Sequence, residues 1–307
     1  MSYTVKIKEE ISTIKSTKSE LIAELSAYIR NNGTITKKEI TFPTENHFIV
    51  ERVINTIKYL YDIEVKEEKI NNLNFSKKPL YQVTIDQKLD KIIEDLCLND
   101  DTVPEYIVGG NEEIRAYLRG AFLSSGSIND PKTSRYHMEI LAIHPEEAVF
   151  IQKLLNIFDL NAKILSREKG YMIYIKEAEK ISDFIKILGA NKAVMYYEDV
   201  RIYRDQKNKT NRLNNCEQAN MDKVFSTANE QLHQIEIIEE NDGVMLLDDR
   251  TKIALEYRKK YPEASLKELA EIISLETSKP LTKSGISHRM RKIKELAERF
   301  EKNKETK

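Results

Sequence analysis

Hydrophobic positions along the chain follow two periods, and the order in which these periods alternate occurs twice. Apolar residues over 21–29 recur every three or four positions, which predicts a helix capped by Ser19. Residues 80–85 alternate apolar and polar side chains, as a half-buried strand does. Residues 112–190 then repeat the preceding succession of helices and strands. The pattern therefore predicts an α+β protein that begins with a pseudo-two-fold pair of αββαββα lobes.

The expected elements follow from these periods and their end signals. In the first lobe we expect a leading helix over 2–15, helices from Ser19, over 48–61 and over 88–97, and strands over 34–42, 63–70 and 80–85. In the second lobe we expect helices over 112–124, 146–158 and 176–188, and strands after Gly126 and over 136–143, 162–167 and 171–175. Pro43 should end the first strand, and Gly170 suits a hairpin turn.

One segment occurs in both lobes and predicts how they meet. Residues 24–35 and 117–128 each have the pattern of a helix that ends at a glycine and is followed at once by a strand. Gly33 and Gly126 are 93 residues apart, which suits two small lobes. Small residues four positions apart allow close packing of two helices. They are Ala23, Ala27 and Asn31 in the first copy and Ala116, Gly120 and Ser124 in the second. The alternative is that these small residues only face a core.

After residue 190 the pattern is helical to the end of the chain. We predict a break in the helical pattern near 208–215. Apolar residues recur every three to five positions from 213 to 235. Ser265 and Glu268 form a capping box, and a last helix opens at Lys283. Its apolar side is Ile286, Met290, Ile293 and Ala297. The stretch from residue 274 to 284 is longer than the turn of a simple helix-turn-helix.

We divide the chain into five parts. They are a first lobe with its leading helix over 1–98, a linker over 99–111, a second lobe over 112–190, a helical connector with a basic Arg/Asn corner over 191–243, and an all-α helix-turn-helix domain over 244–307.

Composition narrows the class of protein. Of the 307 residues 32% are charged, no apolar stretch approaches the ~18 residues of a membrane span, and no signal-peptide core follows Met1. Cys97 and Cys216 lie outside any metal-ligand spacing, and we interpret both as buried thiols. We therefore expect a cytoplasmic protein that does not enter the membrane.

The net charge of −1 hides an asymmetry. Residues 248–307 carry 16 Lys and Arg against 11 Asp and Glu, whereas residues 1–200 carry 27 against 31. Residues 201–215 add five basic side chains and one acid. Affinity for a polyanion follows the local charge within a Debye length, about 10 Å at moderate salt. We therefore expect most affinity for DNA to reside in residues 248–307.

The last helix carries the first candidate DNA-binding site. Apolar anchors on one side and hydrogen-bond donors on the other are what a recognition helix needs. The candidate residues are Lys283, Ser284, Ser287, His288, Arg289, Arg291 and Lys292. The serine hydroxyls can form hydrogen bonds with phosphates or base edges, and Arg289 or Arg291 could bind guanine through two hydrogen bonds. The alternative is a solvated basic face on a three-helix bundle.

A second candidate site lies in the connector, where basic side chains and asparagines interleave. The candidate residues are Arg201, Arg204, Lys209, Asn211 and Arg212. Arg and Lys could straddle phosphates while asparagines cap or read. The asparagines could equally hold a helix–helix corner together.

The repeated helices resemble the LAGLIDADG helices of homing endonucleases. The resemblance implies two helices buried between the lobes and a DNA-binding saddle formed by the sheets. In that family the last acid before the glycine holds a divalent metal, and the corresponding lost-acid positions are Asn32 and Ser125. Neutral side chains cannot supply the charge that Mg²⁺ prefers, and Arg30 adds positive charge nearby. We therefore expect no catalytic residue, no metal and no cofactor.

Together with residues 201–220 and 283–289, the lobes resemble the WhiA family of bacterial regulators, a degenerate LAGLIDADG module joined to a helix-turn-helix. The resemblance covers nearly the whole chain. It implies a non-enzymatic, nucleoid-associated protein that binds double-stranded DNA in transcription regulation, and in cell division, chromosome segregation or sporulation. We expect a monomer, because internal pseudo-symmetry removes the need for a dimer. The acidic balance of residues 1–200 favours a protein partner on that module.

Two other function classes stay open at this point. One is a metal-dependent DNA endonuclease that uses displaced acids, of which Glu24, Glu112 and Glu113 are candidates. The other is a scaffold whose N-terminal module docks proteins and whose DNA contacts are incidental.

Overall fold

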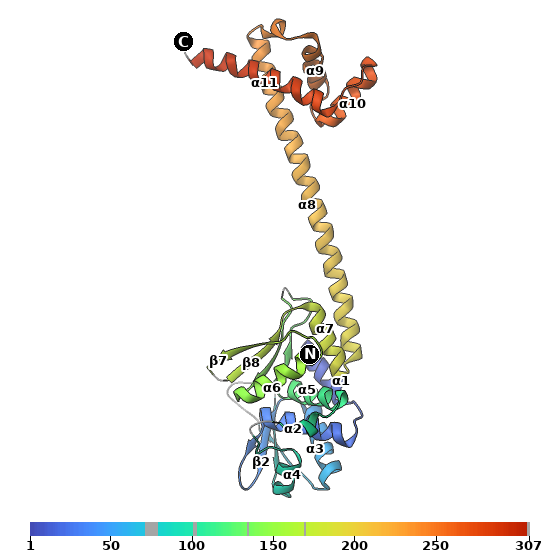
Figure 1. The fold of residues 1–307 in the computed structure, drawn as a ribbon, viewed down its shortest axis with the longest axis vertical. Helices are drawn as coiled ribbons and strands as arrows, with labels where there is room; N and C mark the ends of the chain where they lie inside the picture. Colours follow the sequence, from blue (N-terminus) through green and yellow to red (C-terminus); the bar gives the residue numbers. More distant parts are fainter. Residues whose placement is uncertain (71–78, 101–102, 134, 169, 306–307) are drawn as a thin grey trace. The chain divides into compact units, whose positions relative to one another are not determined.

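Two compact units make up the chain in the computed structural model, Met1–Asp205 and Gln206–Lys307 (Figure 1). The structure describes residues 1–70, 79–100, 103–133, 135–168 and 170–305, with side chains as far as residue 302. Residues 101–102 of the expected linker lie outside this set. Each unit has a hydrophobic core of its own, one with members from Tyr3 to Tyr197 and the other with members from Ile235 to Ala297.

The first unit contains the two expected lobes. Helix α1 (Tyr3–Ser12) precedes a first lobe of α2 (Lys18–Asn32), β1 (Thr34–Ile35), β2 (Ile40–Thr44), α3 (His47–Tyr61), β3 (Lys66–Ile70), β4 (Leu80–Ile85) and α4 (Leu89–Asp95). After the 3-10 turn η1 (Glu105–Val108), the second lobe consists of α5 (Asn111–Ser125), β5 (Ser127–Ile128), β6 (Met138–Ala142), α6 (Pro145–Ile157), β7 (Lys163–Arg167), β8 (Gly170–Ile175) and α7 (Ala178–Leu188). Both lobes have the predicted αββαββα order.

Each lobe has a four-stranded antiparallel sheet, and the two sheets have the same strand order. The orders are β1-β2-β4-β3 and β5-β6-β8-β7. Phe42 and Val83 in the first sheet and Ile140 and Ile173 in the second are fully buried and face the core. The alternation of apolar and polar residues seen in the sequence therefore has its expected cause, because one face of each sheet is covered.

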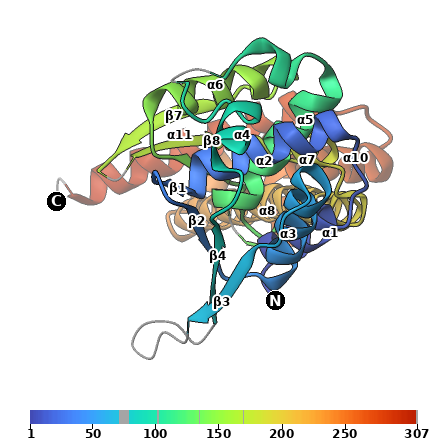
Figure 2. The same ribbon diagram turned by 90° about the horizontal axis from the view of Figure 1, so that it is seen from below.

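Helices α2 and α5 pack side by side where the lobes meet (Figures 1 and 2). A Cβ atom added to Gly120 would lie 2.0 Å from the carbonyl oxygen of Glu24 and 3.1 Å from Cβ of Ala27. Ala23 and Ala116 are fully buried as well. The predicted close packing of the two helices is confirmed, and at Gly120 it depends on the lack of a side chain.

The start of the first lobe differs from its prediction. The N-cap of α2 is Thr17 rather than Ser19, since the Thr17 side chain accepts the N–H of Glu20. The expected strand over 34–42 is a hairpin of β1 and β2, because Thr36 Oγ1 accepts the N–H groups of Lys38 and Glu39 and closes a turn.

Pro43 does not end the first strand as predicted. It lies inside β2 opposite Gln82. Strand β1 pairs with β2 only as far as residue 41, so no described strand pairs with Pro43 on the side that faces away from β4. A residue without an N–H can lie there without breaking a ladder hydrogen bond.

Helix α8 (Asn191–Glu240) shows that the predicted corner at 208–215 was wrong, because it continues through that segment. Neither Gly nor Pro interrupts it, and asparagine lowers helix propensity only mildly. The second unit continues with η2 (Gly243–Leu246), α9 (Asp249–Lys260), α10 (Leu266–Thr277) and α11 (Lys283–Glu305).

The last three helices form the core of the second unit together with the end of α8, which contributes Ile235, Ile237 and Ile238. The predicted capping box of Ser265 and Glu268 opens α10. Helix α10 runs further than its pattern indicated, to Thr277, and the turn to α11 is only residues 278–282. The Ser274 hydroxyl accepts the N–H of Leu281 at 2.8 Å and ties this turn to α10. The length of the turn is thus close to that of a helix-turn-helix.

The structure also bears on the expectations about membrane spans and cysteines. No helix in the described ranges is both long and apolar enough to cross a bilayer. Cys97 is buried as predicted, whereas the prediction for Cys216 was wrong, since it is exposed on α8.

Candidate nucleic-acid interface

The residue before each helix-ending glycine donates a hydrogen bond to a strand. Asn32 Nδ2 donates to the carbonyl oxygen of Pro43 at 2.7 Å, and Ser125 Oγ donates to that of Leu141 at 2.6 Å. Pro43 in β2 and Leu141 in β6 are equivalent by the registers of the two sheets. Both lost-acid positions therefore join a helix end to the second strand of its lobe. An ionised carboxylate has no proton to donate and would lose this contact.

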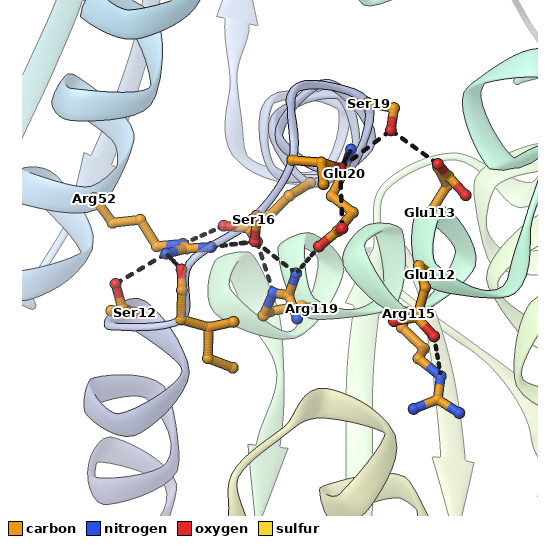
Figure 3. Close-up of polar contacts among 12 residues, drawn as sticks. Ser12, Ser16, Ser19, Glu20, Arg52, Glu112, Glu113, Arg115 and Arg119 are labelled. Atoms are coloured by element: carbon orange, nitrogen blue, oxygen red, sulfur yellow. Dashed lines mark hydrogen bonds and ion pairs between the residues drawn. The ribbon is translucent and has the colours of Figure 1, made fainter.

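Glu24, one of the displaced acids, is buried between two arginines. Its carboxylate accepts hydrogen bonds from Arg52 and, at 2.7 Å, from Arg119 Nε. Arg52 comes from the first lobe and Arg119 from the second, and both also reach the Ser16 hydroxyl (Figure 3). Two cations compensate this carboxylate, so its contacts hold the lobes together.

The other two displaced acids lie near the start of α5. Glu113 accepts a hydrogen bond from the Ser19 hydroxyl at 2.8 Å, and Glu112 lies 3.7 Å from Arg115 (Figure 3). Within the part of the chain that the structure describes, no group of three or more His, Cys, Asp or Glu residues is placed to hold a metal ion.

Helix α11 presents one apolar and one polar side. Its four predicted anchors are buried: Ile286, Met290, Ile293 and Ala297. Of the candidate residues, Lys283, Ser284, His288 and Arg291 are exposed, and Ser287 and Arg289 are half-buried. The structure thus brings the polar candidates together on one helix, opposite or beside the anchors.

Lys292 differs from its neighbours because it already has a partner. Its Nζ donates to Asp248 Oδ2 at 2.8 Å. This hydrogen bond lowers the pKa of the Asp248 carboxyl well below its usual range. Lys283, Arg289 and Arg291 have no ion-pair partner among the described residues.

The candidate residues on α8 fall into two groups. Arg201 pairs with Glu198 at 2.7 Å, which raises the pKa of the guanidinium. Arg204 donates to the carbonyl oxygen of Pro131 at 2.6 Å and lies over the ring of Tyr136. Glu198 lies on α8 itself, but Arg201 also donates to Glu179 of α7 at 3.1 Å, so both arginines fasten α8 to the second lobe. The remaining three are exposed: Lys209, Asn211 and Arg212.

The outward face of the second sheet is apolar at its centre. Leu141 and Leu165 flank Met172 in register across three strands, and they are 41% and 50% exposed. On the first sheet Lys66 is paired with Asp86. On the second sheet Arg167 lies 3.7 Å from Glu139, whereas the exposed Lys163 has no ion-pair partner among the described residues.

Two cations that sequence reasoning passed over lie close to α11. Arg250 of α9 and Lys279 of the turn after α10 line a cavity of about 330 Å³ together with Arg289. Lys279 could have been recognised in the sequence as a candidate because it lies just before the last helix. Nothing in the sequence pointed to Arg250, since only the packing of α9 against α11 brings it close to Arg289.

Comparisons with known proteins agree with this arrangement. Three family models match: the WhiA N-terminal LAGLIDADG-like domain over residues 18–99, the WhiA LAGLIDADG-like domain over 114–207 and the WhiA C-terminal HTH domain over 210–297. A protein of Enterococcus faecalis named "Probable cell division protein WhiA" is 40% identical over 98% of both chains. One of the same name from Pediococcus pentosaceus is 38% identical over 98% of this chain and 99% of its own.

Two solved structures are also similar. The crystal structure of full-length WhiA from Thermatoga maritima has a TM-score of 0.61 at 26% identity and covers 98% of this chain and 99% of its own. A crystal structure of an N-terminal LAGLIDADG domain of WhiA has a TM-score of 0.51 at 26% identity, and covers 61% of this chain and 89% of its own.

Proposed function

Because the chain belongs to the WhiA family, we propose that it is a non-enzymatic, sequence-specific double-stranded DNA-binding protein of the bacterial nucleoid. It acts as a regulator of transcription or as a nucleoid-associated factor in cell division, with chromosome segregation and sporulation as the alternative settings. Similar proteins carry a cell-division name, which favours division.

One observation carries the proposal: the polar side of the first turns of α11. Ser284, His288 and Arg291 are exposed there, while the anchors on the opposite side are buried. A guanidinium without an ion-pair partner is able to bind guanine in the major groove through two hydrogen bonds. Lys209, Asn211 and Arg212 on α8 are further candidates for contacts with phosphates.

The N-terminal module has a different role in this proposal. Its second sheet exposes Leu141 and Leu165, which flank the buried Met172, and residues 1–200 carry a net charge of −4. Both features suit a protein partner better than a polyphosphate. We propose that this module docks a regulatory protein and that the chain is a monomer.

The endonuclease alternative has less support. Its metal positions hold the donors Asn32 and Ser125, and its displaced acid Glu24 is compensated by two arginines. Incubation of supercoiled plasmid with the full chain and Mg²⁺ or Mn²⁺ tests it. Nicking that disappears in the Glu113→Gln variant would revive the enzyme.

Substitution of Arg291 tests DNA reading by the full chain. We expect Arg291→Ala to weaken binding to a duplex selected from a random library by about 1–3 kcal/mol and to relax the preference at one base pair. Arg299→Ala, on the same helix two turns later, is the matched control and should change binding little. Fluorescence anisotropy at fixed salt measures both. Equal affinities of the two variants and the unchanged chain would contradict the assignment of α11.

A further inference from the structure

Three cations from three different elements meet beside the recognition helix. Arg250 lies in the first turn of α9, Lys279 in the turn between α10 and α11, and Arg289 in α11. All three line one cavity of about 330 Å³, whose remaining wall is Ile253, Ile273, Thr277, Pro280 and Leu281. Among the residues that the structure describes, no carboxylate lines this cavity.

The charges in the cavity are not balanced by the protein. None of the three cations has an ion-pair partner among the described residues. Of the acids near these cations in the sequence, Asp248 is held by Lys292 at 2.8 Å and Glu276 by Lys260 at 3.0 Å. Asp249, next to Arg250, is exposed and is not among the residues that line the cavity. Like charges around one cavity repel each other, and an anion bound among them would replace this repulsion by attraction.

We propose that this cavity binds a phosphate group. A phosphate offers several acceptor oxygens on one compact centre, and the two guanidinium groups and one ammonium group offer donors from three directions. The cavity is open to residues of α9, α10 and α11, so a bound phosphate would contact all three helices of the domain.

Arg289 and Arg291 then have different roles, since only Arg289 lines the cavity. Successive residues of a helix point about 100° apart, and Arg289 faces the cavity rather than the exposed side that holds His288 and Arg291. Arg289 is thus a phosphate ligand, and Arg250 and Lys279 complete the site from outside α11. The phosphate comes either from the DNA backbone or from a free phosphorylated compound. The first of these sources rests on the proposed function.

The DNA arm of the test uses the full chain with Arg250→Gln, Lys279→Gln and Arg289→Gln, one at a time. Each loss of a backbone contact should weaken binding to the selected duplex and to an unrelated duplex by the same factor, about tenfold at 0.1 M salt, and should reduce the salt slope by about 0.9. Lys252→Gln is the matched control, since it removes one charge from α9 outside the cavity. Thermal unfolding checks that the variants are folded.

The second arm uses calorimetric titration with inorganic phosphate and with ATP at constant ionic strength. Binding to the unchanged chain that Arg289→Gln abolishes, with DNA affinity unaltered, assigns the cavity to a free phosphorylated compound. Cavity variants that match Lys252→Gln in both arms would overturn the proposal. If Arg291→Ala still weakens DNA binding in that case, the proposed function stands without the cavity. If the unchanged chain binds no duplex, the proposed function fails and the calorimetric arm alone decides the cavity.

Discussion

A buried carboxylate links the two lobes of the N-terminal unit. Glu24 is only 5% exposed, and it accepts hydrogen bonds from one arginine of each lobe. Removing one partner from such a group leaves an uncompensated buried charge, which typically costs about 3–5 kcal/mol. The position that looked like a displaced catalytic acid is therefore a structural one.

Lys8 is a buried cation that has no ion-pair partner in the described part of the chain. Its ammonium donates to the carbonyl oxygen of Leu123 at 3.0 Å, and burial lowers its pKa to about 8. Between this value and the ordinary value of 10.5, the unfolded chain keeps a proton that the folded chain has released. The contribution of Lys8 to the free energy of unfolding therefore rises with pH between these two values.

Comparison with the Lys8→Met variant measures this effect. From pH 8.5 to 9.5, we expect the free energy of unfolding of the unchanged chain to rise relative to the variant by about 1 kcal/mol. Lys6 is an exposed lysine on the same helix, so Lys6→Met is the control. Its free energy of unfolding should change with pH in the same way as that of the unchanged chain. Urea denaturation at each pH supplies the numbers. Parallel curves for Lys8→Met would show that Lys8 does not titrate in this window.

At the scale of elements, the pair of α2 and α5 depends on one position without a side chain. In Gly120→Ala the new Cβ would lie 2.0 Å from the carbonyl oxygen of Glu24, so the helices must move apart. We expect the free energy of unfolding to fall by about 3 kcal/mol. Gly109→Ala is the matched control, because its Cβ would meet nothing closer than 3.8 Å. Similar midpoints in chemical denaturation for the two variants would contradict the close packing.

Helix α8 carries basic residues with two different roles. Arg204 is bound to the second lobe, whereas Arg212 is exposed and has no ion-pair partner among the described residues. We expect Arg212→Gln to reduce the salt slope of DNA binding by about 0.9. Arg204→Gln should leave that slope unchanged and lower stability by about 1 kcal/mol. Titrations at several salt concentrations test this, and a smaller slope for Arg204→Gln alone would reverse the assignment.

At the scale of the whole molecule, the two units have separate hydrophobic cores. Units that each have a hydrophobic core of their own can unfold in separate cooperative transitions. We expect calorimetry to show two transitions. Ile140→Ala should lower only the first unit's transition and Ile293→Ala only the second's, each by about 2–5 kcal/mol, since both side chains are fully buried. A single transition shifted by both substitutions would contradict this independence.

The sequence by itself determined most of the elements, their repeated order and the apolar side of α11, but not the β1–β2 hairpin or the continuity of α8. It did so because helix and strand periods depend on contacts between residues a few positions apart, as at Ile286, Met290 and Ile293. It also identified the neutral residues Asn32 and Ser125 at the two helix ends, since a glycine marks each end.

Only the tertiary structure decided which charged residues remain available. Lys292 is paired with Asp248, 44 positions away, and Arg204 with the carbonyl oxygen of Pro131, 73 positions away. Arg250 reaches the cavity beside Arg289 through the packing of α9 on α11. The physical reason is that the partner of a long charged side chain is set by distant segments that folding brings together. No local period in the sequence records that partner.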